Sequence, residues 1–212
     1  MTSTHYEQLL ADYSNRQHLI DLFRQFRPYL ELLPSLRRPD ESIISIPLPL
    51  VRLRDAMPVS SHEAGRFSAG DLVRLPCDIG VVMCDPKWKI KIGVDVFVFI
   101  HRPQEDFSAL LSRWRQTQIW IDRGYDWLMP TRYQHIFSEG AAQVYPLFVL
   151  TDDAPDHTAQ GLRGAALPFI DVSVRRSADG NVASPDEDGL RQSRADGPAD
   201  SRPNGPDASF EA

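Results

Sequence analysis

One strand-like segment in the middle of the 212-residue sequence limits the possible folds more than any other feature. Within residues 87–100, Val94, Val96, Val98 and Ile100 alternate with Asp95, Phe97 and Phe99. Residues two apart in a strand point to the same face, so both faces of this segment are largely apolar. Strands of this kind are typical of the interior of a sheet. We therefore predict that 87–100 is a central strand, with Gly93 at a β-bulge.

Helical and strand-like patterns on both sides of this segment predict a mixed α+β fold. Apolar residues recur at helical spacing from Tyr6 to Leu30, with a capping box at Thr4 and Glu7. Ser14 and Asn15, with Gln17, are expected to cap a second helical start, and Pro28 is expected to kink or restart the helix. The expected order is a helix (to residue 30), strands (42–53, 71–84 and 87–100), a helix (103–123), a short helix (130–139) and two strands (143–150 and 167–174).

Three of these elements contain residues that leave details open. Pro47 and Pro49 restrict their part of the first strand to a sheet edge. The segment 71–84 is one strand or two short strands broken at Pro76. For the second long helix, Pro103 suits the first turn and Gly124 suits the stop.

A change in composition near Arg176 divides the chain. Residues 176–212 hold 8 acidic residues and 4 arginines with few large apolar residues, so they cannot bury enough surface to offset the entropy of ordering. We predict one α+β domain over 1–175 and a disordered acidic tail over 176–212. Most of the formal charge of −6 lies in that tail.

Targeting, membrane and metal signals are weak in this sequence. We expect no signal peptide at the N-terminus and no membrane span, which indicates a cytoplasmic protein. Cys77 and Cys84 fall on opposite faces if they share one strand, and a disulfide becomes possible only if residues 78–80 form a tight turn. The six histidines show no metal-ligand spacing, so no cofactor is expected.

The three lysines of the chain, Lys87, Lys89 and Lys91, lie at period two and would share one strand face. From Lys87 to Arg132 there are 8 basic and 5 acidic residues, with aromatic residues interleaved. This composition is typical of single-stranded nucleic-acid binders, although a solvated strand face, on which lysines discourage edge-to-edge pairing, explains the three lysines more simply. The candidate binding residues are Lys87, Lys89, Lys91, Arg113, Arg115, Trp127, Arg132 and Tyr133.

Residues 122–133 form an aromatic-rich connection between the two predicted helices. Exposed Trp, Tyr and Arg side chains in such a connection are the usual anchors of interfaces. The alternative is that Trp127, Leu128 and Met129 fill the core between the helices. The sequence does not decide between these two interpretations.

The order helix, three strands, helix, strand resembles the core of restriction-endonuclease-like nucleases. Those enzymes place an acidic residue on one strand and an acid-x-lysine pair on the next, where the acidic residues bind a divalent metal and the site positions water. The resemblance implies Asp71 and Asp85 as ligands of a metal such as Mg²⁺ and Lys87 as the catalytic residue. Pro86 fits this pattern poorly, because it lies where a residue that donates a ladder hydrogen bond is expected. Residues 84–87 could also simply form a hairpin turn.

Our leading hypothesis is a non-enzymatic binding protein that contacts a macromolecular partner, either protein or nucleic acid. The contact surface would be the face built by the lysine-bearing strand (87–100) and the Trp- and Arg-rich helix (103–123). The metal-dependent nuclease is the second hypothesis. A structural or oligomer-forming subunit is the third, and it requires an exposed aromatic face on the first helix. The turn at Gly70 and Asp71 also suits a small barrel of the SH3 type, although the same residues suit any hairpin.

Overall fold

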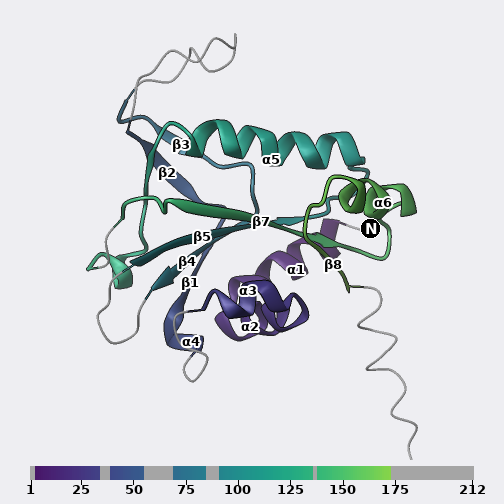
Figure 1. Ribbon diagram of the computed structural model, residues 1–212, viewed down its shortest axis with the longest axis horizontal. Helices are drawn as coiled ribbons and strands as arrows, with labels where there is room; N and C mark the ends of the chain where they lie inside the picture. The colour runs from purple at the N-terminus through teal and green to yellow at the C-terminus, as the bar shows by residue number, and fades with distance from the viewer. Residues whose placement is uncertain (1–2, 34–38, 55–68, 85–90, 136–137, 173–212) are drawn as a thin grey trace, which may run out of the picture.

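The computed structural model describes residues 3–33, 39–54, 69–84, 91–135 and 138–172, and the structural statements below refer to these residues. A five-stranded sheet forms the middle of the protein (Figure 1). Its strands lie in the order β1 (Ile43–Pro47), β4 (Ile79–Cys84), β5 (Lys91–Ile100), β7 (Gln143–Leu150) and β8 (Phe169–Asp171). β1, β4 and β5 pair antiparallel, whereas β5, β7 and β8 pair parallel. The predicted central position of the Val94–Ile100 segment is confirmed.

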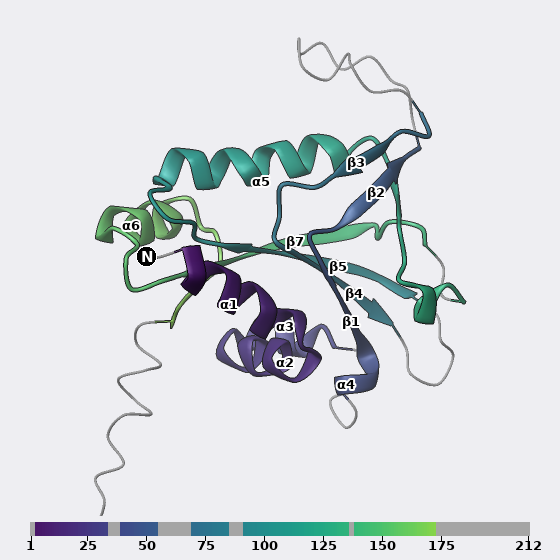
Figure 2. The same ribbon diagram turned by 180° about the vertical axis from the view of Figure 1, so that it is seen from behind.

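Three short helices cover one face of this sheet (Figures 1 and 2). They are α1 (Ser3–Ser14), α2 (Arg16–Gln25) and α3 (Arg27–Glu31), followed by the single turn α4 (Pro39–Ser42). Leu19, Ile20 and Phe23 are fully buried against alternate side chains of β4 and β5. The restart at Asn15 is confirmed, because its side chain caps α2 by accepting from the backbone N–H of Gln17 at 2.9 Å. The restart at Pro28 is confirmed as well, since this proline lies in the first turn of α3.

A second layer covers the opposite face of the sheet. It contains α5 (Phe107–Ile121), α6 (Asp156–Gly164) and a small antiparallel sheet in the order β3 (Leu72–Arg74), β2 (Leu50–Leu53) and β6 (Tyr125–Trp127). Aromatic rings dominate this side of the core: Phe97 stacks on Trp127 with ring centroids 5.6 Å apart. Gly80 permits this contact, because a Cβ at that position would lie 2.4 Å from the Trp127 ring.

Two segments predicted as possible single strands each contribute to both sheets. Residues 42–53 form β1 and β2, separated where Leu48 adopts a φ of 45° before Pro49. Residues 71–84 form β3 and β4, which confirms the alternative with a break at Pro76. Pro47 ends β1, an outer strand of the five-stranded sheet, as expected for a residue that cannot donate a ladder hydrogen bond.

The helix predicted for 103–123 begins later than expected. Its N-cap is Asp106, which accepts from the backbone N–H of Ala109 at 2.7 Å, and the preceding Gln104 has a non-helical φ of 60°. The helix ends at Ile121, and Gly124 follows with a φ of 72°, as the stop signal predicts.

Three further differences concern the C-terminal half of the described chain. The short helix predicted for 130–139 is only a 3₁₀ turn, η2 (Thr131–Tyr133), and neither β6 nor α6 was predicted. β7 has the predicted bounds. β8 is Phe169–Asp171, so residues 167, 168 and 172 of the predicted 167–174 lie outside the strand, and residues 173 and 174 lie outside the described residues.

The α+β class is confirmed. The predicted disordered tail, 176–212, lies outside the described residues. Within the residues that are described, no helix combines the length and the apolar character needed to cross a membrane.

Candidate anion-binding cleft

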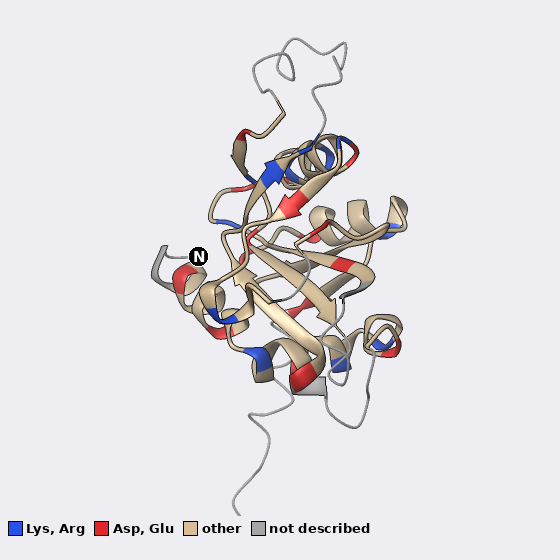
Figure 3. Cartoon of the chain, turned by 90° about the vertical axis from the view of Figure 1, so that its left-hand side faces the viewer, with Lys and Arg blue, Asp and Glu red and all other residues tan. Residues whose placement is uncertain are grey.

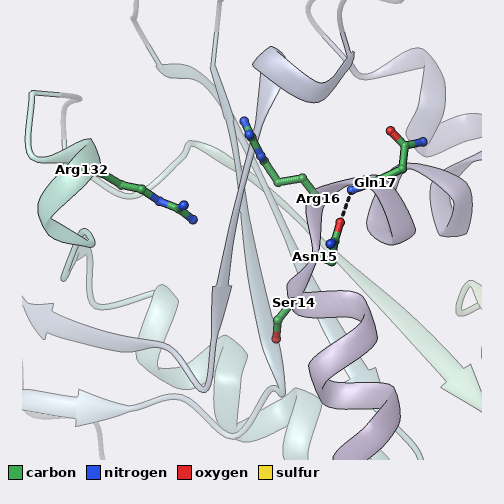
Figure 4. Close-up of a pocket in the computed structure, with 5 residues that line it drawn as sticks. All are labelled: Ser14, Asn15, Arg16, Gln17 and Arg132. Carbon is green, nitrogen blue, oxygen red and sulfur yellow. Dashed lines mark hydrogen bonds between the residues drawn. The ribbon is translucent and has the colours of Figure 1, made fainter.

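A polar cleft lies between the junction of α1 with α2 and the 3₁₀ turn η2 (Figure 4). It encloses about 450 Å³ and is lined, among the described residues, by Ser14, Asn15, Arg16, Gln17 and Arg132. Arg16 and Arg132 extend into this space from opposite sides, as Figure 4 shows. We call this site the arginine cleft. All of its described lining side chains are polar, and its two charged groups are both cationic.

The α1–α2 junction holds Arg16 at the edge of the cleft. α1 ends where the Ser14 hydroxyl donates to the backbone carbonyl of Leu10, and Asn15 then caps α2. The buried Tyr13 fixes this junction to the five-stranded sheet, because its carbonyl accepts from the Ser45 hydroxyl at 3.3 Å. Arg16 is the first residue of α2 and is exposed. Its position therefore follows from the cap that begins the helix.

The second arginine lies on η2 beside an aromatic ring. The Arg132 guanidinium carbon is 4.7 Å from the centroid of the Tyr133 ring. Arg132 is exposed, whereas Tyr133 is half-buried and packs against the aromatic side of the core. Within the described chain, no carboxylate forms an ion pair with Arg132. Its charge is therefore not neutralised by a direct contact there.

A buried carboxylate anchors the segment that carries η2. Asp95 of β5 has no exposed surface, and its Oδ2 accepts from the Tyr125 hydroxyl at 2.6 Å, from Trp127 Nε1 at 2.9 Å and from the Ala141 backbone N–H at 2.9 Å. Burial, followed by the charge of Asp95, raises the pKa of Tyr125 far above its ordinary value. These three bonds attach both ends of the segment 125–141 to the central strand.

A second buried carboxylate, Asp78, forms an ionic cluster at the other end of β5. Asp78 has no exposed surface. Its carboxylate oxygens accept hydrogen bonds from two guanidinium groups, those of Arg113 and, at 2.9 Å, Arg102. They also accept from the Tyr6 hydroxyl at 2.6 Å and from the Ile100 backbone N–H at 2.7 Å. Burial, and next the charge of Asp78, raise the pKa of Tyr6 to about 12. Because both carboxylate oxygens are engaged by these donors, we interpret the Asp78 cluster as a structural clamp and not as a ligand site.

Two of the eight sequence-predicted binding residues are buried. Arg113 is 8% exposed and Trp127 is 2% exposed. Arg113 is on the inner face of α5 together with Leu110, Trp114 and Thr117, where it donates to Asp78 and Glu105. The core interpretation is therefore confirmed for Trp127, whose indole N–H donates to Asp95, and for the buried Met129. It is wrong for Leu128, which is 47% exposed.

The other predicted binding residues have different positions. Arg115 is exposed on α5, and Arg132 and Tyr133 lie on η2 at the arginine cleft. Lys91 is the first residue of β5, whereas Lys87 and Lys89 lie outside the described residues. The structure thus places one predicted binding residue, Arg132, on the lining of the cleft.

The residues proposed for a nuclease are only partly described. The helix–strand–strand–strand–helix–strand order is obtained from α1–α3, β1, β4, β5, α5 and β7 only if the intervening elements are left out. These are α4 before β1, β2 and β3 after β1, and β6 with η2 between α5 and β7. Asp71 directly precedes β3 of the small sheet, and Asp85 and Lys87 lie outside the described residues. Among the described residues, no group of three or more His, Cys, Asp or Glu side chains could hold a metal ion.

Of the five described lining residues, only Arg132 was predicted as a binding residue; Ser14, Asn15, Arg16 and Gln17 were not. The capping pair Asn15 and Gln17 indicates that Arg16 begins a helix, but nothing in the sequence connects it with Arg132.

No protein-family model, no curated protein and no solved structure matches the chain.

Proposed function

We propose that the protein binds nucleic acid, with the arginine cleft as the contact for the phosphate backbone. One observation carries this proposal: Arg16 and Arg132, which are far apart in the sequence, extend into the same cleft from two different layers of the fold (Figure 4). Guanidinium groups are planar, remain charged and donate in pairs to phosphate oxygens, which makes them the preferred side chains for phosphate recognition.

The neutral lining residues suit the same ligand. The Ser14 hydroxyl and the amide groups of Asn15 and Gln17 are uncharged hydrogen-bonding groups of the kind that position a nucleic-acid backbone. They add no negative charge that would oppose a phosphate. The described lining of the cleft therefore combines charge attraction with polar contacts.

A wider basic surface would extend this contact. β5 begins on the same side of the protein as η2 in both ribbon views (Figures 1 and 2), and Lys91 is its first residue. We include the period-two lysines Lys87, Lys89 and Lys91 in the proposal, because three cations at this spacing would follow successive phosphates if they share one strand face. Figure 3 shows that both basic and acidic residues lie along the chain on this side.

The proposal is tested by charge reversal with a matched control. Arg16→Glu/Arg132→Glu changes the cleft, whereas Arg52→Glu/Arg74→Glu makes the same change in net charge on the small sheet, where both arginines are exposed. Fluorescence anisotropy with a labelled oligonucleotide, at about 50 mM and about 200 mM salt, measures binding. We expect salt-sensitive binding by the wild type, a loss of about tenfold or more in the cleft variant, and a much smaller loss in the control.

Two results would contradict the proposal. One is a wild type that does not bind the oligonucleotide even at low salt. The other is an equal loss of affinity in both double variants, since this would show only the effect of net charge. If the oligonucleotide is instead cut in the presence of Mg²⁺, and Asp85→Ala abolishes the cutting, the nuclease hypothesis replaces the binding proposal.

A further inference from the structure

We infer that Arg132 and Tyr133 form a stacking platform for an unpaired base, so that the partner is single-stranded nucleic acid. This inference rests on the proposed function and specifies its ligand. The two arginines of the cleft then have different roles. Arg16 supplies charge to the backbone, whereas Arg132 supplies charge and a planar surface.

The contact between Arg132 and Tyr133 is the basis of this difference. The guanidinium carbon of Arg132 lies 4.7 Å from the centroid of the Tyr133 ring. Tyr133 is half-buried against the core, so its ring is fixed from behind. Arg132 is exposed and extends into the cleft, so its guanidinium is accessible to a ligand there (Figure 4).

The backbone that carries the platform is also held in place. The Tyr133 N–H donates to the Pro130 carbonyl at 2.8 Å and closes the 3₁₀ turn. Asp95 binds the chain before this turn at Trp127 and after it at Ala141. A group that is ordered before binding loses little further entropy when the ligand arrives, which favours stacking at this position.

Bases bind such platforms only when they are unpaired and unstacked. Aromatic rings and guanidinium planes take up splayed bases of single strands, whereas a duplex keeps its bases within the helix. A phosphate contact, by contrast, is available in both forms. A cleft that uses both contacts therefore binds single strands more tightly than duplexes of the same sequence.

The experiment compares three probes that carry equal numbers of phosphates per strand: a thymidine oligonucleotide, its abasic counterpart and a duplex. Arg132→Lys keeps the positive charge and removes the planar guanidinium group. Arg16→Lys makes the same substitution in the same cleft and is the matched control. We expect the wild type to bind the thymidine strand about tenfold more tightly than the abasic strand, the lower range of one stacked base. Arg132→Lys should abolish this difference, whereas Arg16→Lys and Tyr133→Phe should retain it.

The possible failures are distinguishable. Equal wild-type affinities for the thymidine and abasic strands overturn the stacking inference and leave the proposed phosphate contact intact. Equal wild-type affinities for the single strand and the duplex would also overturn the stacking inference and leave the phosphate contact intact. A preference for the thymidine strand that remains in Arg132→Lys would have the same consequence. If the wild type binds none of the three probes, the stacking inference and the proposed function are both overturned.

Discussion

Asp78 illustrates how a single buried charge can connect distant parts of a chain. It precedes β4 and accepts hydrogen bonds from α1 through Tyr6, from the end of β5 through Ile100 and from α5 through Arg113. Arg113 in turn donates to Glu105 and to the Ile100 carbonyl. Such a network is favourable only while all of its members are present, since a buried ion that loses its partner keeps its desolvation cost.

We predict that Asp78→Asn destabilises the protein by about 3–5 kcal/mol, because it leaves the buried Arg113 guanidinium with much less compensating charge. The control is Glu31→Gln, which removes an exposed ion pair with Arg27 and should cost less than about 1 kcal/mol. Urea unfolding measures both values. Similar losses in the two variants would show that the Asp78 cluster does not stabilise the fold.

Stability should also fall at high pH because of buried tyrosines. The pKa of Tyr6 is raised to about 12, first by burial and then by the charge of Asp78, and the pKa of Tyr29 is raised mainly by burial. The unfolded chain loses these protons near pH 10, whereas the folded chain retains them. The contribution of the protonated Tyr6 to the free energy of unfolding is therefore fully present below about pH 10, and it is lost as the pH rises toward 12.

Urea midpoints between about pH 9 and about pH 11 measure this effect. Tyr6→Phe should reduce the pH dependence, since one of the responsible groups is then absent. An unchanged dependence in Tyr6→Phe would contradict the assignment to Tyr6.

At the scale of elements, the sequence predicts what is encoded locally. The capping pair of Asn15 and Gln17, the proline in α3 and the glycine after α5 all act on neighbouring residues, and all three operate in the structure as predicted. β5 is predicted for a similar reason: a strand that is apolar on both faces needs cover on both sides.

Elements that depend on distant partners were predicted poorly. β6 is three residues long and exists because it pairs with β2. Arg113 was predicted as a binding residue, yet its helical spacing with Leu110, Trp114 and Thr117 places it on the inner face of α5. Its true position requires Asp78, which is distant in the sequence, as a partner.

Asp95 should control the order of the segment 125–141. In Asp95→Ala, the Tyr125 hydroxyl, the Trp127 N–H and the Ala141 N–H lose their common acceptor, at about 1–3 kcal/mol for each donor left buried and unsatisfied. We expect hydrogen exchange to accelerate across 125–141 more than in α1 and α2. A uniform change across the protein would show that Asp95 stabilises the whole fold and not this segment in particular.

At the scale of the whole molecule, the central sheet separates two layers that both contribute to the cleft. Arg16 belongs to the helices on one face, and Arg132 follows β6 on the other. The chain passes between the two sheets after β1, after β3, and again before and after β6. Local sequence patterns contain no information on such crossings, which is why the placement of Arg16 opposite Arg132 could not be predicted from the sequence.

The salt dependence of binding tests the proposed phosphate contact most directly. For a single strand, each phosphate contact contributes about −0.7 to the slope of the logarithm of the binding constant against the logarithm of the salt concentration. Loss of both cleft arginines, in Arg16→Ala/Arg132→Ala, should therefore make this slope shallower by about 1.4. A slope identical to that of the wild type would contradict the assignment of the arginine cleft as the nucleic-acid contact.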